Sequence, residues 1–187
     1  MQPYAIVLAA GFSRRIGQCK ASLPWAGGHT LLSYQISQLG LAGFQVIIVV
    51  GPHNQDLASK YAEIISSGLP SNREKNYKSS FQKEANQSVQ NSLQTHWVMN
   101  SAASSGKVSS ILTGLSYVPV DCSAILISAV DQPRSANVYS RLLHAHLSSQ
   151  DSSSGLHLSK ITVPTHNGNV GHPLVFASSS LPVLKKI

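Results

Sequence analysis

The chain has 187 residues, 42% of them hydrophobic, and its fourteen Lys and Arg against seven Asp and Glu give a formal net charge of +7. The length suits one domain of about 100–200 residues, and no run approaches the roughly 18 apolar residues of a membrane span. The basic surplus favours anionic partners, but no Lys/Arg cluster interleaved with aromatics appears, so a small phosphorylated ligand is favoured over nucleic acid.

The first half of the chain alternates predicted strands and helices. Apolar runs at 4–10 and 44–50 are rich in Val and Ile and too short for helices, which predicts strands buried on both faces of a parallel sheet. Between them, residues 30–39 carry apolar side chains at helical spacing, and Thr30 is the expected N-cap. Residues 54–65 predict the next helix.

The second half opens with a break and then resumes the alternation. Residues 70–94 are polar and poor in apolar side chains, which predicts a long excursion, either partly disordered or a surface helix. The later predicted elements are a strand at 96–99, a helix at 109–117, a strand at 124–130, a helix at 136–147 and a strand pair from 161–164 and 172–176. This order predicts an α/β/α three-layer sandwich with a mostly parallel, Rossmann-like sheet, formed by residues 1–187 as one domain.

The amino terminus and the cysteines favour a cytoplasmic location. The start, MQPYAIVLAAG, lacks a basic segment, and its apolar run is too short for a secretory signal peptide. Cys19 and Cys122 form no disulfide or metal-binding pattern and suit a reducing compartment. We therefore expect a cytoplasmic protein that does not contact membranes.

A basic, glycine-punctuated loop follows the first predicted strand. Ligands of open α/β sheets bind beyond the carboxyl ends of the strands, and Gly11 permits a tight exit there. Arg15 and Lys20 supply cations suited to phosphate oxygens. The spacing matches neither G-x-G-x-x-G nor a Walker A loop. The residues alone therefore leave two alternatives, a phosphate loop or a basic solvated turn.

The same loop reads L-A-A-G-x-S-x-R-x-G-x-x-K. It resembles the signature loop of the MobA-like nucleotidyltransferases, and within them most closely the molybdenum cofactor cytidylyltransferase branch. Guanylyltransferase relatives carry Gly-Gly where this chain has Ala9-Ala10, a difference associated with cytosine versus guanine. The resemblance implies the fold of the nucleotide-diphospho-sugar transferases. It also implies nucleotide binding by Leu8, Ala9, Ala10, Gly11, Ser13, Arg15 and Lys20.

Three later stretches resemble the same family in the same order. Asn100 and the run GKVSSILTG at 106–114 are similar to an element of its nucleotide pocket, which implies that Asn100 and Ser110 bind nucleotide. Asp131-Gln132-Pro133 resembles its metal-binding Asp-x-Pro. Gly171-His172-Pro173 resembles the Gly-His-Pro beside its second-substrate pocket, which implies that His172 binds the acceptor.

The position of Asp131 in the sequence marks it as a candidate site residue independently of the resemblance. It is the only one of the seven carboxylates that directly follows the carboxyl end of a predicted buried strand. Mg²⁺ is usually held by one or two carboxylates together with phosphate oxygens and water. The alternative role is a helix N-cap, for which Ser135 is better placed. We therefore expect Asp131 to hold Mg²⁺.

The resemblance implies transfer of CMP from CTP to molybdopterin, with release of pyrophosphate. The expected catalytic residues are Arg15 and Lys20, which hold the triphosphate, and Asp131, which holds Mg²⁺ between phosphate oxygens. The expected partners are CTP or another nucleoside triphosphate, a molybdopterin-type phosphorylated acceptor and a molybdoenzyme or its chaperone. A sugar-phosphate or other small-molecule nucleotidyltransferase is the nearest enzymatic alternative.

A second alternative is a nucleotide- or cofactor-binding protein without turnover that serves a molybdoenzyme. Members of the resembled family continue beyond the Gly-His-Pro element into a segment with an Asp-rich motif, and no such motif follows Gly171-His172-Pro173 here. A carboxyl-terminal segment is therefore expected to be missing. That expectation is the feature that favours a binding protein over an enzyme.

Overall fold

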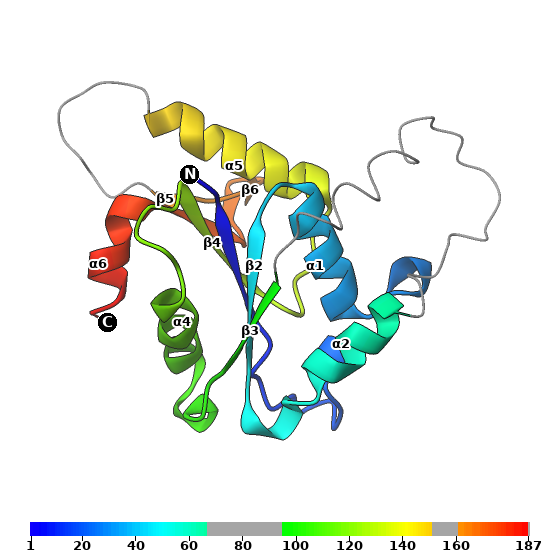
Figure 1. The fold of residues 1–187 in the computed structure, drawn as a ribbon. Coiled ribbons are helices and arrows are strands. Elements are labelled where there is room, and N and C mark those ends of the chain that lie inside the picture. The colour runs from blue at the N-terminus through cyan, green and yellow to red at the C-terminus, as the bar shows by residue number, and fades with distance from the viewer. Residues whose placement is uncertain (67–94, 151–160, 187) are drawn as a thin grey trace, which may run out of the picture.

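The computed structural model describes residues 1–66, 95–150 and 161–186, so the excursion predicted at 70–94 lies outside the described residues. Its centre is a six-stranded sheet with the order β3-β2-β1-β4-β8-β5 (Figure 1). Strands β1 to β4 are mutually parallel, and β8 runs antiparallel to both β4 and β5. The strands are β1 (Tyr4–Leu8), β2 (Gln45–Val50), β3 (Thr95–Met99), β4 (Ala124–Ala129), β5 (Ile161–Thr162) and β8 (Leu174–Ala177), with a separate hairpin of β6 (Thr165–His166) and β7 (Asn169–Val170).

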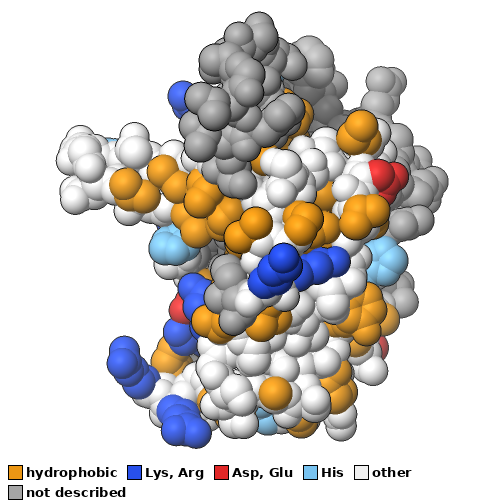
Figure 2. All heavy atoms as spheres, turned by 90° about the vertical axis from the view of Figure 1, so that its left-hand side faces the viewer, with side chains coloured by type: hydrophobic (Ala, Val, Ile, Leu, Met, Phe, Trp, Pro, Cys, Tyr) orange, Lys and Arg blue, Asp and Glu red, His pale blue; other side chains and the backbone are white. Residues whose placement is uncertain are grey.

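Helices cover both faces of the sheet and complete the predicted three layers (Figure 1). One face carries α1 (Leu31–Leu41), α2 (Leu57–Ser66) and α5 (Ala136–Gln150), and the other carries α4 (Lys107–Ser116) and the short α6 (Leu181–Leu184). Figure 2, which looks onto the α4 and α6 face, shows hydrophobic side chains gathered across it. None of the described helices is long and apolar enough to span a membrane.

The strand alternation separates two apolar layers. On β2, Val46, Ile48 and Val50 pack toward α1, α2 and α5, whereas Ile47 and Val49 pack toward α4. These residues are at most 4% exposed, so both faces of the strand are buried. This explains the continuous apolar run, because a parallel strand covered on both sides has no solvent-facing positions.

Helix α1 begins where its sequence predicts. The backbone N–H of Ser33 donates to Thr30 Oγ1 at 3.1 Å, and the Thr30 N–H donates to Ser33 Oγ at 2.9 Å. Two backbone donors that a helix start leaves unpaired are thereby satisfied. The expected N-cap at Thr30 is confirmed.

Several predicted boundaries are wrong by a few residues. The strand expected at 4–10 ends at Leu8, because beyond Leu8 only the Ala9 N–H still bonds to β2, at Val49 O. Ala9 and Ala10 are nonetheless buried, one in each of the two apolar layers. Helix α2 begins at Leu57, after a short turn that contains Asn54. The strand pair predicted near the carboxyl end is confirmed as β5 and β8.

Helix α4 packs against the sheet through Gly114, which predicts the first mutational result. A Cβ added at Gly114 would lie 2.5 Å from Ile6 Cγ2 and 3.1 Å from Val49 Cγ2. We expect Gly114→Ala to lower the free energy of unfolding by about 1–3 kcal/mol, which outweighs the roughly 1 kcal/mol gained in helix propensity. Urea unfolding measures the change, with Ser116→Ala on the exposed side of the same helix as the control. Equal stability of the two variants would contradict it.

Candidate functional site

A cavity of about 490 Å³ opens at the carboxyl ends of β1 and β4. Strand β1 lies between β2 and β4 in the sheet, so the chain order reverses at this point, where open α/β sheets bind their ligands. The lining comes from residues 8–14 with Lys20 and Ala21, from 103–110 at the start of α4, and from Ala129–Asp131. The topology thus unites three of the four segments that resemble the family, all except Gly171-His172-Pro173.

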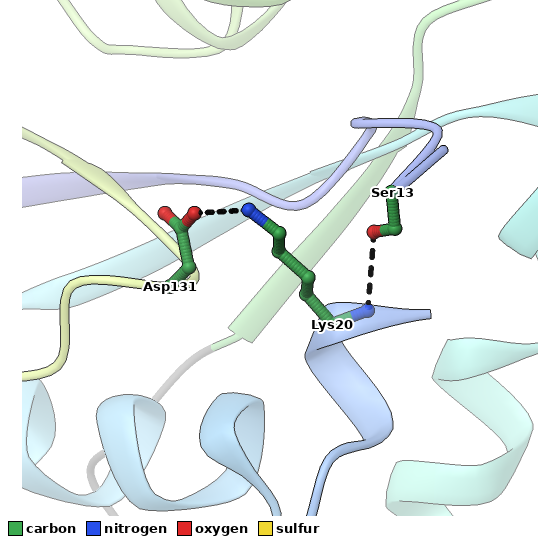
Figure 3. Close-up of polar contacts among 3 residues, drawn as sticks. All are labelled: Ser13, Lys20 and Asp131. Carbon is green, nitrogen blue, oxygen red and sulfur yellow. Dashed lines mark hydrogen bonds and ion pairs between the residues drawn. The ribbon is translucent and has the colours of Figure 1, made fainter. Parts of the chain in front are cut away.

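The loop after β1 is held by its own hydrogen bonds. Ser13 adopts a left-handed conformation with φ of 49°, and its carbonyl accepts from the N–H groups of Ile16 at 2.9 Å and Gly17 at 3.1 Å. Its hydroxyl accepts from the Lys20 N–H at 3.2 Å (Figure 3). Ser13 therefore fixes the backbone from which the Lys20 side chain extends.

Lys20 and Asp131 meet across the cavity. Lys20 Nζ lies 2.6 Å from Asp131 Oδ2, and the two side chains are 34% and 39% exposed (Figure 3). One residue comes from the loop after β1 and the other follows β4. Lys20 was predicted to bind the triphosphate and Asp131 to bind a metal ion. In this structure the two side chains form an ion pair with each other.

Residues after β2 brace the loop after β1, and sequence reasoning missed them. Asn54 is 3% exposed, and its side-chain amide donates to Ala9 O at 2.8 Å while its oxygen accepts from Gly51 N at 2.8 Å. The His53 ring stacks on Phe12 with centroids 4.2 Å apart. The sequence could have indicated them, because His53 and Asn54 follow the carboxyl end of a predicted buried strand, as Asp131 does.

The two side-chain hydrogen bonds of Asn54 predict that its loss lowers both the stability of the fold and the affinity for nucleotide. Asn54→Ala leaves Ala9 O and Gly51 N without their partner, and buried unsatisfied groups cost about 1–3 kcal/mol. We expect that loss in urea unfolding, and weaker nucleotide binding because the loop is no longer oriented. Exposed Gln55→Ala is the matched control and should stay within about 0.5 kcal/mol of the parent. Parent-like stability of Asn54→Ala would show that the two hydrogen bonds contribute little.

A buried polar network supports the loop that carries Asp131. Gln35 Nε2 of α1 donates to Ser128 Oγ at 2.8 Å and to Tyr139 OH at 3.3 Å. Tyr139 OH in turn accepts from the Arg134 N–H at 3.3 Å. Burial raises the pKa of the Tyr139 hydroxyl, which therefore stays neutral. Helices α1 and α5 thus anchor the turn just after Asp131.

Most of the predicted site residues line the cavity, and a few do not. Leu8, Ala9, Ala10, Gly11, Ser13, Lys20, Ser110 and Asp131 all line the cavity. Arg15 is exposed and does not line it, whereas its neighbour Arg14 does, with its guanidinium 5.4 Å from the centroid of the Phe12 ring. The direct nucleotide contacts predicted for Arg15 therefore require a different side-chain position from the one in this structure.

Asn100 and His172 also lie outside this lining. Asn100 is 3% exposed, and its amide donates to the hydroxyls of Ser109 and Ser110 at 2.9 and 3.0 Å. Asn100 therefore contacts the cavity only through Ser110, whose hydroxyl it orients. His172 lines a second cavity that adjoins the first.

The charge of the cavity suits a polyanion. Among the described residues, its lining holds three cations, Arg14, Lys20 and Lys107, and one carboxylate, Asp131. No group of three or more His, Cys, Asp or Glu side chains that could hold a metal occurs in the described ranges. Asp131 still fits Mg²⁺, because phosphate oxygens and water complete such sites. With Asp131 as the one carboxylate of the described lining, phosphate oxygens of a ligand and water would complete such a site.

A mostly parallel sheet with a cationic cavity at its switch point is typical of α/β proteins that bind phosphorylated ligands. Residues 5–187 match the MobA-like NTP transferase domain, and the chain belongs to this family. No curated protein matches the chain.

Solved structures share the fold. Rv0371c from Mycobacterium tuberculosis H37Rv is 21% identical with a TM-score of 0.65, over 100% of this chain and 77% of that chain, and it has also been solved in complex with manganese. The 4-diphosphocytidyl-2C-methyl-D-erythritol synthase of Anaerococcus prevotii is 15% identical, with a TM-score of 0.59 over 99% and 75% of the two chains. A UDP-glucose pyrophosphorylase solved with UDP-glucose is 16% identical, with a TM-score of 0.60 over 100% and 80%. The predicted fold class is confirmed.

Proposed function

We propose that this chain transfers CMP from CTP to the phosphate of a molybdopterin-type acceptor. The observation that carries the proposal is the cavity at the ends of β1 and β4, whose described lining holds three cations and one carboxylate. Such a lining neutralises a triphosphate and accepts one divalent cation. The cytoplasmic location expected from the sequence belongs to the same proposal.

The reaction needs positioning and charge neutralisation rather than a covalent enzyme intermediate. An oxygen of the acceptor phosphate forms a bond to the α-phosphorus of CTP. The bond from that phosphorus to the bridging oxygen breaks, and pyrophosphate leaves with the electron pair. Lys20 and Arg14 face the cavity and stabilise the leaving charge, while Arg15 remains a predicted contributor from the exposed side of the loop.

Among the described residues that line the cavity, one carboxylate could hold a metal. Asp131 is the proposed ligand, and the bound cation would neutralise charge on the phosphate oxygens. The manganese complex of Rv0371c supports a divalent cation in proteins of this fold. Mg²⁺ is the ion we propose for this chain, because its hard, oxygen-rich coordination matches one carboxylate plus phosphates.

The preference for CTP rests on Ala9 and Ala10. Both line the cavity and are 3% and 4% exposed. Each adds a methyl group where the guanylyltransferase relatives have glycine, and added volume disfavours the larger purine.

Calorimetric titration with all four nucleoside triphosphates and Mg²⁺ tests this preference. We expect CTP to bind most tightly. The double variant Ala9→Gly/Ala10→Gly should reduce the difference in affinity between CTP and GTP. Equal or tighter GTP binding by the parent would reject the cytidylyl assignment and leave the family unchanged.

A second candidate is a nucleotide-binding protein without turnover that serves a molybdoenzyme or its chaperone. The observation that favours it is the single carboxylate in the described lining, already paired with Lys20. Release of pyrophosphate from CTP with molybdopterin and Mg²⁺ separates the two candidates. Binding of CTP without pyrophosphate release would support the binding protein.

A further inference from the structure

Phe12, in the loop after β1, lines the cavity at the ends of β1 and β4. Its side chain is 43% exposed, so it gains only part of the burial free energy of a core phenylalanine. Among the described residues of the lining, Phe12 is the one aromatic residue. Its contacts with neighbouring side chains therefore indicate what the ring contributes to the site.

His53 covers one face of the Phe12 ring. The two rings are stacked, with centroids 4.2 Å apart and an angle of 19° between their planes. His53 belongs to the turn Pro52–Asn54 after β2, and the parallel pairing of β1 with β2 brings this turn and the loop after β1 to the same end of the sheet (Figure 1). His53 Nε2 also lies 3.3 Å from Gly11 O. The stack therefore fixes the plane of the Phe12 ring.

Gly51 leaves the space that the His53 ring occupies. A Cβ added at Gly51 would lie 2.7 Å from His53 Cε1 and 2.9 Å from His53 Nδ1, so any larger residue would displace the ring. The φ of Gly51 is −101°, which other residues also adopt. The close approach of His53, rather than the backbone conformation, therefore requires glycine here.

The Arg14 guanidinium lies over the Phe12 ring, with Arg14 Cζ 5.4 Å from the ring centroid. A cation within about 6 Å of an aromatic centroid is attracted by the ring quadrupole. Neither of the two ion pairs among the described residues includes Arg14. The next residue, Arg15, is exposed and does not line the cavity. The contact with the ring thus distinguishes Arg14 from its neighbour.

A guanidinium that is already held in the cavity binds a polyanion at lower cost. An exposed arginine side chain samples many rotamers, and immobilising it on a ligand costs conformational entropy. A guanidinium that packs on a ring through its flat face also keeps its N–H donors, which lie in its plane, for phosphate oxygens. The ring contact and a phosphate contact are therefore compatible.

We propose that Phe12, fixed by its stack on His53, is a positioning residue that holds the Arg14 guanidinium toward a bound triphosphate. The inference rests on the proposed function, since it requires the cavity to bind a nucleoside triphosphate. It states that the ring acts through Arg14 and not by stacking on the base of the nucleotide.

A double-mutant cycle of Phe12→Leu and Arg14→Gln tests the coupling, with CTP titrated calorimetrically into the full chain. We expect Phe12→Leu to weaken CTP binding roughly two- to fivefold in the parent and to have no further effect when Arg14 is already replaced. Phe12→Tyr keeps a ring and should restore most of the loss. A parallel cycle with Arg15→Gln should be additive. Additivity in the Arg14 cycle, or equal coupling in both cycles, would overturn the inference.

Inorganic triphosphate separates an effect through Arg14 from stacking on the base. This probe carries the charged phosphate chain and has no base. We expect Phe12→Leu to weaken the binding of inorganic triphosphate and of CTP by the same factor. A loss of CTP affinity with unchanged affinity for inorganic triphosphate would show that the ring contacts the nucleoside, and it would overturn the inference.

The Arg14 side-chain NMR signals give a readout that needs no ligand. An aromatic ring shifts the signals of nuclei that lie over it. The shifts of the Arg14 side chain should be lost in Phe12→Leu, reduced in His53→Ala and retained in Phe12→Tyr. Gln55→Ala, an exposed change beside the same turn, should leave them unchanged. Identical Arg14 signals in the parent and Phe12→Leu would overturn the inference.

Titration with all four nucleoside triphosphates separates this inference from the proposed function. CTP binding with an additive Phe12–Arg14 cycle would overturn the positioning role and leave nucleotidyl transfer standing. Failure of all four nucleoside triphosphates to bind would overturn the proposed function. Binding of inorganic triphosphate that depends on Phe12 only while Arg14 is present would, in that case, still support the ring as the group that positions Arg14 for an anion.

Discussion

Replacement of Lys20 by alanine is expected to weaken nucleoside triphosphate binding by roughly one to two orders of magnitude. The Lys20 ammonium lines the cavity and is held there by Asp131 Oδ2 at 2.6 Å. A charge-assisted hydrogen bond to a phosphate contributes about 1.5–3 kcal/mol, which corresponds to this loss of affinity. Isothermal titration with CTP measures it directly.

The fold should tolerate this change. Both partners of the ion pair are more than a third exposed on their side chains, at 34% and 39%, and exposed pairs contribute roughly 0–1 kcal/mol to stability. Lys60→Ala is the matched control, because Lys60 forms the other described ion pair, with Asp56 on the exposed side of α2. If Lys20→Ala and Lys60→Ala both bind CTP like the parent, the Lys20 side chain has no role in CTP binding.

Much of the sheet follows from local sequence. The runs at 44–50 and 124–130 match β2 and β4 to within one residue, because short apolar runs rich in β-branched residues, each with a single polar residue, are typical of strands that are covered on both faces. The run at 4–10 was harder to delimit, because Ala9 and Ala10 are buried in the two apolar layers although the strand ends at Leu8. Apolar composition does not distinguish buried residues of a strand from buried residues that follow it.

The site was predictable in its location but not in its supporting contacts. Asp131 and the loop after β1 follow strand ends, and the topology brings them together. The choice between Arg14 and Arg15 depends on the path of an irregular loop, which has no side-chain periodicity to indicate direction. The Gln35–Ser128 hydrogen bond joins residues far apart in the chain, and only the packing of α1 on β4 brings them into contact.

Asp131→Asn is expected to abolish nearly all metal-dependent turnover and to leave the thermal unfolding midpoint within a few degrees of the parent. The amide keeps the shape and one acceptor oxygen but loses the charge that attracts the cation. Among the described residues that line the cavity, no other carboxylate can compensate. Pyrophosphate release reports turnover, and Mn²⁺ titration followed by paramagnetic resonance, with and without CTP, reports binding.

The Lys20–Asp131 ion pair makes these titrations decisive. In the free protein the Lys20 ammonium competes with a cation for Asp131 Oδ2, so Mn²⁺ alone should bind the parent weakly. A triphosphate is expected to attract the Lys20 ammonium to its own oxygens and to release the Asp131 carboxylate. CTP should therefore strengthen Mn²⁺ binding to the parent but not to Asp131→Asn.

Without nucleotide, Lys20→Ala should bind Mn²⁺ more tightly than the parent. The double variant Lys20→Ala/Asp131→Asn should lose that gain. Asp56→Asn, in the other ion pair, should bind like the parent. If Asp131→Asn keeps CTP-dependent Mn²⁺ binding, Asp131 serves only to hold Lys20, and the metal ligand lies elsewhere.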